Sequence, residues 1–299
     1  MSGILALIFW SSTVAFARSL SDSIGIINAA ALIFTLSGLI GCLWLLITGE
    51  LKSIIKLSRL YLFVCGGLFV TYMLCLYLAI GTAATELQAI EAGIINYLWP
   101  GLTLAFCVPL LGYRATWALV PATVIGFAGA ALAAAGGAGL SWQGFVINMQ
   151  AHPVPYALAL SAAVSWALYS SLTRRLAAGV SSRTVPVFLL ASGLVFMIIR
   201  PFFHEEAQWS IPALLELSYM VLVPTLLAYS LWDIAMRRGN MILIAAVSYL
   251  TPVLSTAISC VYLGVLPHWS LWAGCVLVTA GAVLSRISVR EVPGKNLVT

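Results

Sequence analysis

The sequence predicts an all-α integral membrane protein with ten transmembrane helices, arranged as two inverted repeats of five helices each. Three observations predict this fold: the composition, the number of apolar runs, and a tyrosine–proline pattern that occurs once in each half. Of the 299 residues, 62% are hydrophobic and only 8% are charged, whereas about a quarter of a soluble domain is charged. A transmembrane β-barrel is excluded because its strands would alternate apolar and polar residues.

A helix needs about 20 largely apolar residues to cross a bilayer. The ten runs closest to this description are 3–17, 25–48, 60–80, 86–110, 117–136, 155–177, 184–200, 213–236, 241–264 and 269–287. Because each half holds an odd number of spans, the second half should enter the membrane upside down relative to the first. We therefore expect a first repeat at 1–136, an outer linker at 137–154, a second repeat at 155–290 and a cytoplasmic tail at 291–299.

The pattern shared by the two halves is a tyrosine three residues before a proline. It reads Asn96-Tyr97-Leu98-Trp99-Pro100 in the first half and Ser248-Tyr249-Leu250-Thr251-Pro252 in the second. A proline removes the helix hydrogen bond to the carbonyl four residues earlier, so the carbonyls of Asn96 and Ser248 need another partner. Matched helix breaks in two halves point to a substrate site between them. We expect Pro100 and Pro252 to act as hinges.

Basic residues predict the orientation of the chain. With a cytoplasmic amino terminus, every lysine and arginine except Arg18 and Arg200 falls in an inner loop or in the tail. An excess of basic residues on the cytoplasmic side is the usual topology signal, so both termini are expected in the cytoplasm. The net charge of +5 is therefore a sign of topology, and no nucleic-acid partner is expected.

Aromatic residues with polar tips lie within the spans as well as at their ends. Tryptophan and tyrosine normally gather at membrane interfaces, so a set inside the spans favours a central cavity that supplies water or ligand to their polar groups. Glu91, about two turns before Pro100, is expected to face the same cavity because charges inside a membrane are costly. The expected substrate-binding residues are Trp10, Tyr77, Glu91, Tyr97, Trp99, Trp166, Tyr169, Tyr229, Trp232 and Tyr249.

Other charged groups have structural explanations. Asp233 precedes Arg237 by four residues, a spacing that suits an ion pair on one helix face, although contact with substrate or a proton is a second possibility. Glu86 lies close to an outer boundary. His204, Glu205 and Glu206 lie together in an outer loop, where solvated charge explains them better than metal binding does.

No enzyme motif is found, and the six cysteines lie in apolar runs without metal-binding spacing. We expect no catalytic residues, no metal and no cofactor. Small residues recur on one face of the fifth span, at Ala122, Gly126, Ala130 and Ala134. Such faces allow close helix packing, here within one subunit, and the protein is expected to be a monomer or a weak homodimer.

The run Ala245-Ala246-Val247-Ser248-Tyr249-Leu250-Thr251-Pro252-Val253, followed by Val261-Tyr262-Leu263-Gly264, resembles the drug/metabolite transporter superfamily, specifically its ten-helix branch built from two EamA repeats. The sequences around Trp10 and Pro100 are similar to those of the aromatic amino-acid exporters in this superfamily. The resemblance implies a cavity lined by helices one, three, four, six, eight and nine in the bacterial inner membrane. One departure is Val265, where the superfamily usually has an acidic residue.

These observations lead to a functional hypothesis: a secondary transporter that exports amino acids, aromatic ones included, by alternating access. The alternative is an importer or exchanger of another small metabolite such as a nucleotide-sugar, which would favour mid-span arginine or lysine residues that the sequence lacks. From other classes, a membrane-embedded lipid-modifying enzyme would need a catalytic constellation, and a scaffold would have no use for paired helix breaks.

Overall fold

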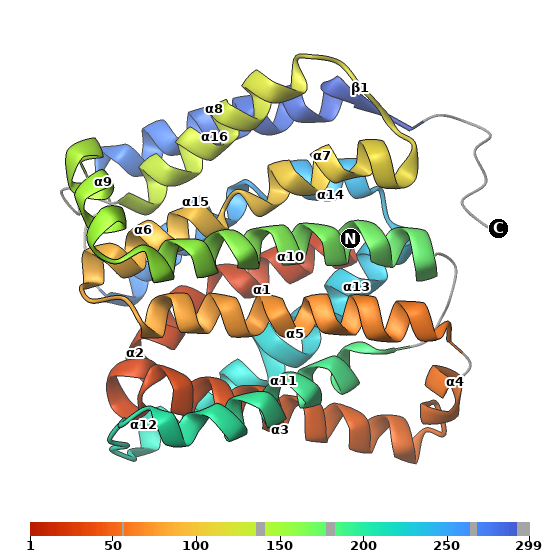
Figure 1. Cartoon of the computed structure of the whole chain (residues 1–299), viewed down its shortest axis with the longest axis vertical. Coiled ribbons are helices and arrows are strands. Elements are labelled where there is room, and N and C mark those ends of the chain that lie inside the picture. Colours follow the sequence, from red (N-terminus) through yellow and green to blue (C-terminus); the bar gives the residue numbers. More distant parts are fainter. Residues whose placement is uncertain (56, 136–140, 178–182, 264–267, 292–299) are drawn as a thin grey trace.

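The structure is a computed structural model that describes residues 1–55, 57–135, 141–177, 183–263 and 268–291. It is almost entirely helical (Figure 1). The first half contains α1 (Ser2–Ser11), α2 (Thr13–Ile24), α3 (Ile26–Ile47), α4 (Leu51–Ile55), α5 (Arg59–Gly81), α6 (Glu86–Asn96), α7 (Trp99–Leu111), β1 (Arg114–Ala115) and α8 (Leu119–Ala135). After α9 (Trp142–Ala151), the second half contains α10 (Pro153–Ala177), α11 (Val185–Ile199), η1 (Arg200–Phe202), α12 (Ile211–Met220), the π-helix η2 (Val221–Leu227), α13 (Ala228–Arg238), α14 (Met241–Val247), α15 (Leu250–Leu263), α16 (Trp269–Ser288) and β2 (Val289–Arg290).

Among the described residues, six helices or continuous helix runs are long and apolar enough to cross a membrane, and eight if each of two bent pairs is one span. The α8 helix is apolar but shorter, and α10 is long but rich in serine, threonine and tyrosine. The coarse prediction, an all-helical membrane protein, is thus confirmed. The count of ten spans and the inverted repeat remain predictions.

The first span differs from its expected bounds of 3–17. The helix continues to Ile24 as α2, and α1 and α2 meet at an angle of 47°. The bend lies at Ser11 and Ser12, whose hydroxyls donate to the carbonyls of Leu7 and Phe9 in the preceding turn. Hydrogen bonds of this kind compete with the helix and bend it. The chain then turns at Gly25, where a positive φ of 84° favours glycine.

Both expected helix breaks are present. The chain leaves helical geometry between α6 and α7, just before Pro100, and α14 and α15 meet at an angle of 41° just before Pro252. The expected free carbonyl of Ser248 is, however, not free, because the Thr251 amide donates to it at 3.0 Å. A tight turn of the backbone therefore satisfies this group in place of water or substrate.

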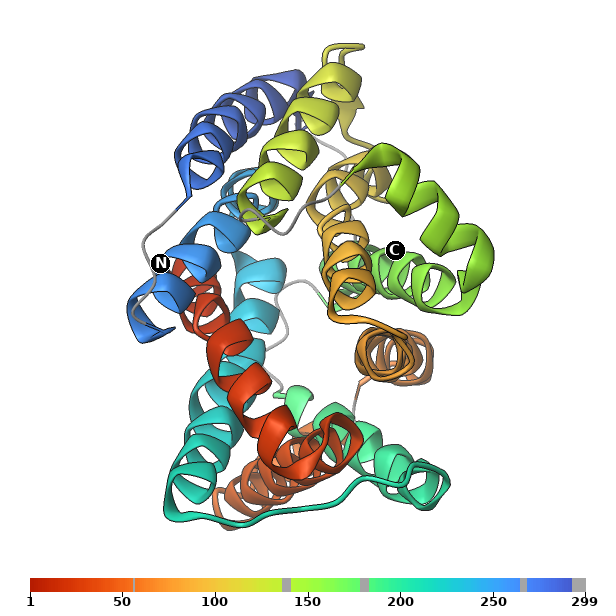
Figure 2. The same ribbon diagram turned by 90° about the vertical axis from the view of Figure 1, so that its left-hand side faces the viewer.

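Helices of the first half lie beside helices of the second. The α3 helix packs on α11, α5 on α10, α1 on α13, and α8 on α16. The predicted small-residue face accounts for the last pair, since a Cβ at Gly281 would lie 2.4 Å from the Gly126 nitrogen. The α8 and α16 helices lie together at one edge of the molecule, far from α3 and α12 at the other (Figures 1 and 2).

One end of the bundle carries most of the basic residues, and we call it the basic end. Arg174 Nη1 donates to the Arg237 carbonyl at 2.9 Å, which joins the ends of α10 and α13. Glu50 pairs with Arg183 at 3.5 Å, which joins the end of α3 to the start of α11. At the opposite end Arg18, which fell outside the topology rule, pairs with Glu86 at 3.1 Å.

The outer loop of the second half is more ordered than expected for solvated charge. Glu205 accepts hydrogen bonds from the backbone nitrogens of Ile27 at 3.0 Å and Asn28 at 2.8 Å. These are amides at the start of α3, which have no partner within the helix. The prediction of a solvated loop charge is therefore wrong for Glu205, which caps α3. Glu206 is exposed.

The expected linker at 137–154 also contains more structure than a wet loop. Within it, α9 is capped by the Ser141 hydroxyl, which accepts a hydrogen bond from the Gly144 amide at 3.0 Å. The side of α9 that carries Asn148 contacts α6 and α10. The residues 136–140 lie outside the described part of the chain.

Candidate functional site

A cluster of aromatic rings occupies the junction of the two halves. It is formed by Trp10 of α1, Phe69 and Tyr72 of α5, Trp99 of α7, Trp166 and Tyr169 of α10, and Tyr229 and Trp232 of α13, and we call it the aromatic cluster. Trp166 lies at its centre, with ring centroids 4.6 Å from Tyr72, 5.6 Å from Trp10 and 5.9 Å from Trp232. Each such pair contributes about 0.5–1.5 kcal/mol beyond the burial of its surface.

The polar tips of three of these rings have protein partners. Trp10 Nε1 donates to the Pro224 carbonyl at 3.0 Å, which links α1 to the π-helix η2 across the two halves. Trp232 Nε1 donates to Ser170 Oγ at 3.2 Å, and Tyr169 Oη donates to Asp233 Oδ1 at 3.1 Å. A proline inside the eighth span was the available signal for η2. That proline, Pro224, belongs to no repeated motif, so the sequence pattern does not distinguish it.

The aromatic cluster is closed in this conformation, in contrast to the wide cavity expected from the sequence. Trp99 is 5% exposed, Trp166 is 1% exposed, and Tyr169 and Trp232 are fully buried. The rings interlock at edge-to-face and tilted angles, as for Trp99 and Trp232 at 5.3 Å and 86°. Trp10 and Tyr229 are half-buried, so the accessible part of the cluster lies on their side.

A group of tyrosines lies next to the aromatic cluster. Tyr77 and Tyr97 are half-buried, and both lie close to Tyr72, as Tyr229 does. The break between α6 and α7 ends at these rings and brings Asn96 beside them. Asn96 is 8% exposed; its side-chain amide interacts with the hydroxyl of Tyr72, but its Oδ1 has no hydrogen-bond partner among the described residues. A buried acceptor of this kind is costly unless something donates to it, and a ligand ammonium group can do so.

Glu91, an expected binding residue, lies apart from the aromatic cluster. Its carboxylate is 2% exposed and accepts hydrogen bonds from Tyr156 Oη and, at 3.2 Å, from Asn148 Nδ2. The expectation that Glu91 faces a water-filled cavity is therefore wrong in this structure. The charge is satisfied by α9 and α10, which it joins to α6. The sequence could not show this, because the partners come from the linker and from the next repeat.

Tyr249 also lies apart from the aromatic cluster. It is fully buried in a smaller core with Ala130, Ala133 and Val278, against α8 and α16, and Tyr97 packs on the same core. Its ring lies against α8 because Gly126 has no side chain; a Cβ there would be 3.2 Å from the ring. The two tyrosines of the repeated motif thus lie near each other, but Tyr249 does not join Trp99 and Trp166.

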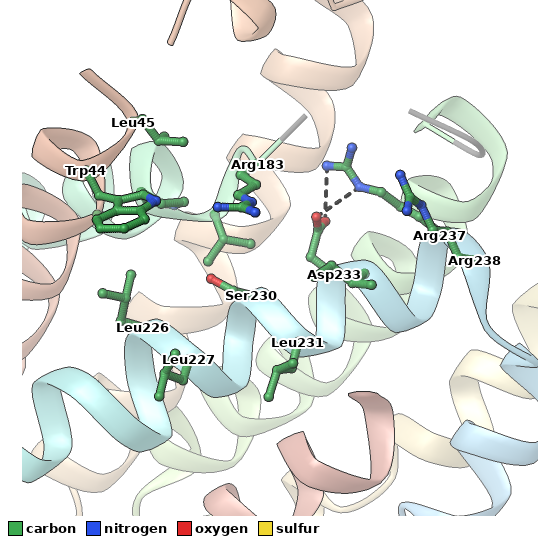
Figure 3. Close-up of a pocket in the computed structure, with 14 residues that line it drawn as sticks. Trp44, Leu45, Arg183, Leu226, Leu227, Ser230, Leu231, Asp233, Arg237 and Arg238 are labelled. Atoms are coloured by element: carbon green, nitrogen blue, oxygen red, sulfur yellow. Dashed lines mark hydrogen bonds and ion pairs between the residues drawn. The ribbon is translucent and has the colours of Figure 1, made fainter. Parts of the chain in front are cut away.

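A buried polar network lies at the basic end and includes an ion pair between Asp233 and Arg237 (Figure 3). The predicted pair of Asp233 and Arg237 is confirmed, with Arg237 Nε 2.9 Å from Asp233 Oδ2 and side chains that are 4% and 2% exposed. Arg237 Nη2 also donates to Tyr61 Oη at 2.6 Å and to Thr184 Oγ1 at 2.9 Å. Tyr169 connects this network to the aromatic cluster. The network therefore ties α5, α10, α11 and α13 together.

A pocket of about 550 Å³ lies beside this network, between α3, the start of α11, η2 and α13. Most of its wall is aliphatic, and its polar part contains Arg183, Ser230, Asp233, Arg237 and Arg238. It contains none of the ten expected binding residues. Among the described residues there is no group of three or more histidine, cysteine or acidic side chains that could hold a metal ion.

Comparison with known proteins agrees with the membrane fold. The model of the EamA-like transporter family matches residues 1–135 and again residues 154–287. The aromatic amino acid exporter YddG of Escherichia coli (strain K12) is 34% identical over 97% of both chains. The YddG protein of Ancylobacter novellus is 31% identical over 97% of both chains.

A solved crystal structure superposes with a TM-score of 0.78 at 29% identity and covers 95% of both chains. The family model matches two segments that together make up most of the chain, and two curated relatives span nearly its whole length. On these grounds the chain belongs to the EamA-like transporter family.

Proposed function

We propose that this protein is a secondary transporter that exports amino acids, including aromatic ones, across the bacterial inner membrane. The observation that carries the proposal is the aromatic cluster at the junction of the two halves, together with the neighbouring tyrosines and the unpartnered Asn96 Oδ1. Aromatic faces suit an aromatic side chain, and a buried acceptor suits an ammonium group. The names of the YddG relatives support the same substrate class.

The proposed architecture has ten spans in two inverted repeats, at 1–136 and 155–290. Two features support it. A twofold axis that relates the halves would convert the contact of α5 with α10 into the contact of α1 with α13, and both contacts are present. The same axis would leave the pair of α3 with α11 and the pair of α8 with α16 unchanged, and both of these pairs are present as well. Prolines also interrupt the α6–α7 and α14–α15 runs at equivalent places. The gathering of arginines at the basic end supports a cytoplasmic location for that end and for both termini.

In this proposal the substrate binds on the side of the aromatic cluster where Trp10 and Tyr229 are accessible. Tyr77, Tyr97 and Asn96 contact its polar groups, and Trp99 and Trp166 lie beneath its ring. Entry of substrate from the basic end requires the network of Asp233 and Arg237 to separate, with α6–α7 and α14–α15 bending about Pro100 and Pro252. Tyr249 takes part through that bending, since its ring packs on α8.

Everted membrane vesicles test the proposal. Trp99→Ala and Trp166→Ala should each lower phenylalanine transport at least tenfold, because they remove rings from the centre of the site. Trp117→Ala is the control, since that tryptophan is 84% exposed. Transport by both ring variants at the parent rate, with equal protein in the membrane, would show that the site assignment is wrong.

A further inference from the structure

We propose that the pocket at the basic end binds one anionic phospholipid. The pocket is an opening in the side of the helix bundle, because residues of its wall are exposed at the surface of the spans. Trp44 is 57% exposed, Leu227 is 50% exposed and Ile234 is 40% exposed. In a membrane such side chains face lipid, so an acyl chain can reach the pocket directly from the bilayer.

The charges of the lining favour an anion. Arg183, Arg237 and Arg238 carry three positive charges and Asp233 carries one negative charge, so the lining has a net charge of +2. Arg237 already forms a buried ion pair with Asp233. Arg238 is exposed and forms no ion pair with a described residue. Arg183 has only a solvent-exposed contact with Glu50 at 3.5 Å, and pairs of that kind are weak. The guanidinium groups of Arg183 and Arg238 are therefore available to a phosphate.

The length of the apolar wall matches one leaflet of the bilayer. Leu227 and Arg238 are eleven positions apart in the sequence, which is about 17 Å at a helical rise of about 1.5 Å per residue. Half of the hydrocarbon thickness is about 15 Å. A chain that runs along Leu227 and Leu231 (Figure 3) would thus end near the middle of the membrane when its phosphate is at the arginines.

The occupant suggested by these features is a phospholipid rather than a free phosphate or an amino acid. Basic pockets between transmembrane helices on the cytoplasmic side are typical binding sites for anionic headgroups. A free phosphate would bury no apolar surface against the aliphatic lining, whereas the acyl chain of a lipid would bury apolar surface there and so bind more favourably. The proposal does not depend on which cargo is transported.

Native mass spectrometry of the detergent-purified protein tests the site. Dioleoyl phosphatidylglycerol should form a one-to-one adduct at concentrations where dioleoyl phosphatidylcholine does not. The double variant Arg183→Ala/Arg238→Ala should weaken the adduct roughly thirtyfold, from the contribution of basic residues near an anionic headgroup. The control is Arg114→Ala/Arg290→Ala, which removes the same charge from the exposed β1–β2 pair at the basic end and should leave the adduct unchanged.

A second variant tests whether the acyl chain lies in the pocket, and it also replaces the arginine variant as the test if that variant is unstable. Ser230→Trp fills the pocket and keeps both arginines, and it should abolish the phosphatidylglycerol adduct. Equal adducts with the two lipids would overturn the proposal, as would equal losses in the two arginine variants. The proposal would also be overturned if Ser230→Trp still bound phosphatidylglycerol fully, or if glycerol phosphate displaced the lipid at a similar concentration. Either result would mean that the arginines bind only a phosphate at the surface.

Discussion

Replacing Asp233 with asparagine tests whether the buried network holds the basic end closed. Asparagine keeps an oxygen that can accept the hydrogen bond from Tyr169, so the change removes little apart from the charge. It leaves the Arg237 guanidinium in a site where its side chain is 2% exposed. An uncompensated charge in such a site strongly favours any conformation that admits water.

The size of the effect follows from the burial of the pair. Breaking a buried ion pair by removing one partner costs about 3–5 kcal/mol. If water solvates Arg237 in the open conformation, most of this cost raises the free energy of the closed conformation relative to the open one. Since 1.4 kcal/mol corresponds to a factor of ten, the ratio of open to closed molecules should rise more than a hundredfold.

Cys65 provides a native reporter for this opening. It is fully buried on α5, one turn from Tyr61, whose hydroxyl accepts a hydrogen bond from Arg237. In the Asp233→Asn protein, N-ethylmaleimide should label Cys65 at least ten times faster than in the parent. Peptide mass spectrometry separates Cys65 from the other five cysteines. Circular dichroism should show that both proteins remain folded.

Two further variants make the experiment specific. Glu86→Gln removes a carboxylate from the exposed Arg18 pair, whose side chains are 58% and 83% exposed, and should not change the labelling rate. Asp233→Asn combined with Arg237→Gln removes both charges and should return the rate most of the way to that of the parent. An unchanged rate in the single variant, with the fold intact, would refute the role of this pair in closure.

Three other predictions concern packing, capping and bending. Gly101→Ala should lower the free energy of unfolding by about 1–3 kcal/mol, because a Cβ there would lie 2.3 Å from a side-chain carbon of the neighbouring α8. Gly93→Ala is the control: a Cβ there would have nothing within 4 Å, so this change should be neutral or slightly stabilising. Glu205→Ala should lower the free energy of unfolding by about 0.5–2 kcal/mol through loss of the α3 cap, and Glu206→Ala should not. Pro252→Ala should slow turnover of phenylalanine more than it weakens binding; unchanged turnover at equal expression would contradict a hinge there.

The sequence predicted the helical segments better than it predicted their contacts. Nine of the ten expected runs agree with the observed helices to within a few residues, because long apolar runs limit where a helix can begin and end. The first run was cut short since Arg18 and Asp22 are polar, although α2 continues through both. Arg18 is exposed at the end of the bundle opposite the basic end, so its charge is solvated there.

The orientation of side chains around each helix could not be predicted. Most spans are apolar on all sides, so their sequences contain little information about which face points inward. Position along the helices alone therefore predicts one binding site that contains Trp10, Trp99, Trp166 and Tyr249. In the structure Tyr249 packs toward α8 instead. The pairing of Asp233 with Arg237 was predictable because it depends on spacing within one helix. The partners of Glu91 come from other helices and were not.

The central claim is that an aromatic amino acid binds against the aromatic cluster and beside Asn96. The most direct measurement is an experimental structure of the protein with bound phenylalanine. We expect the phenyl ring to contact Trp10, Trp166 or Tyr229 and the ammonium group to lie within hydrogen-bond distance of Asn96 Oδ1. Phenylalanine bound only in the pocket of Arg183 and Asp233, with the aromatic cluster unchanged, would contradict it.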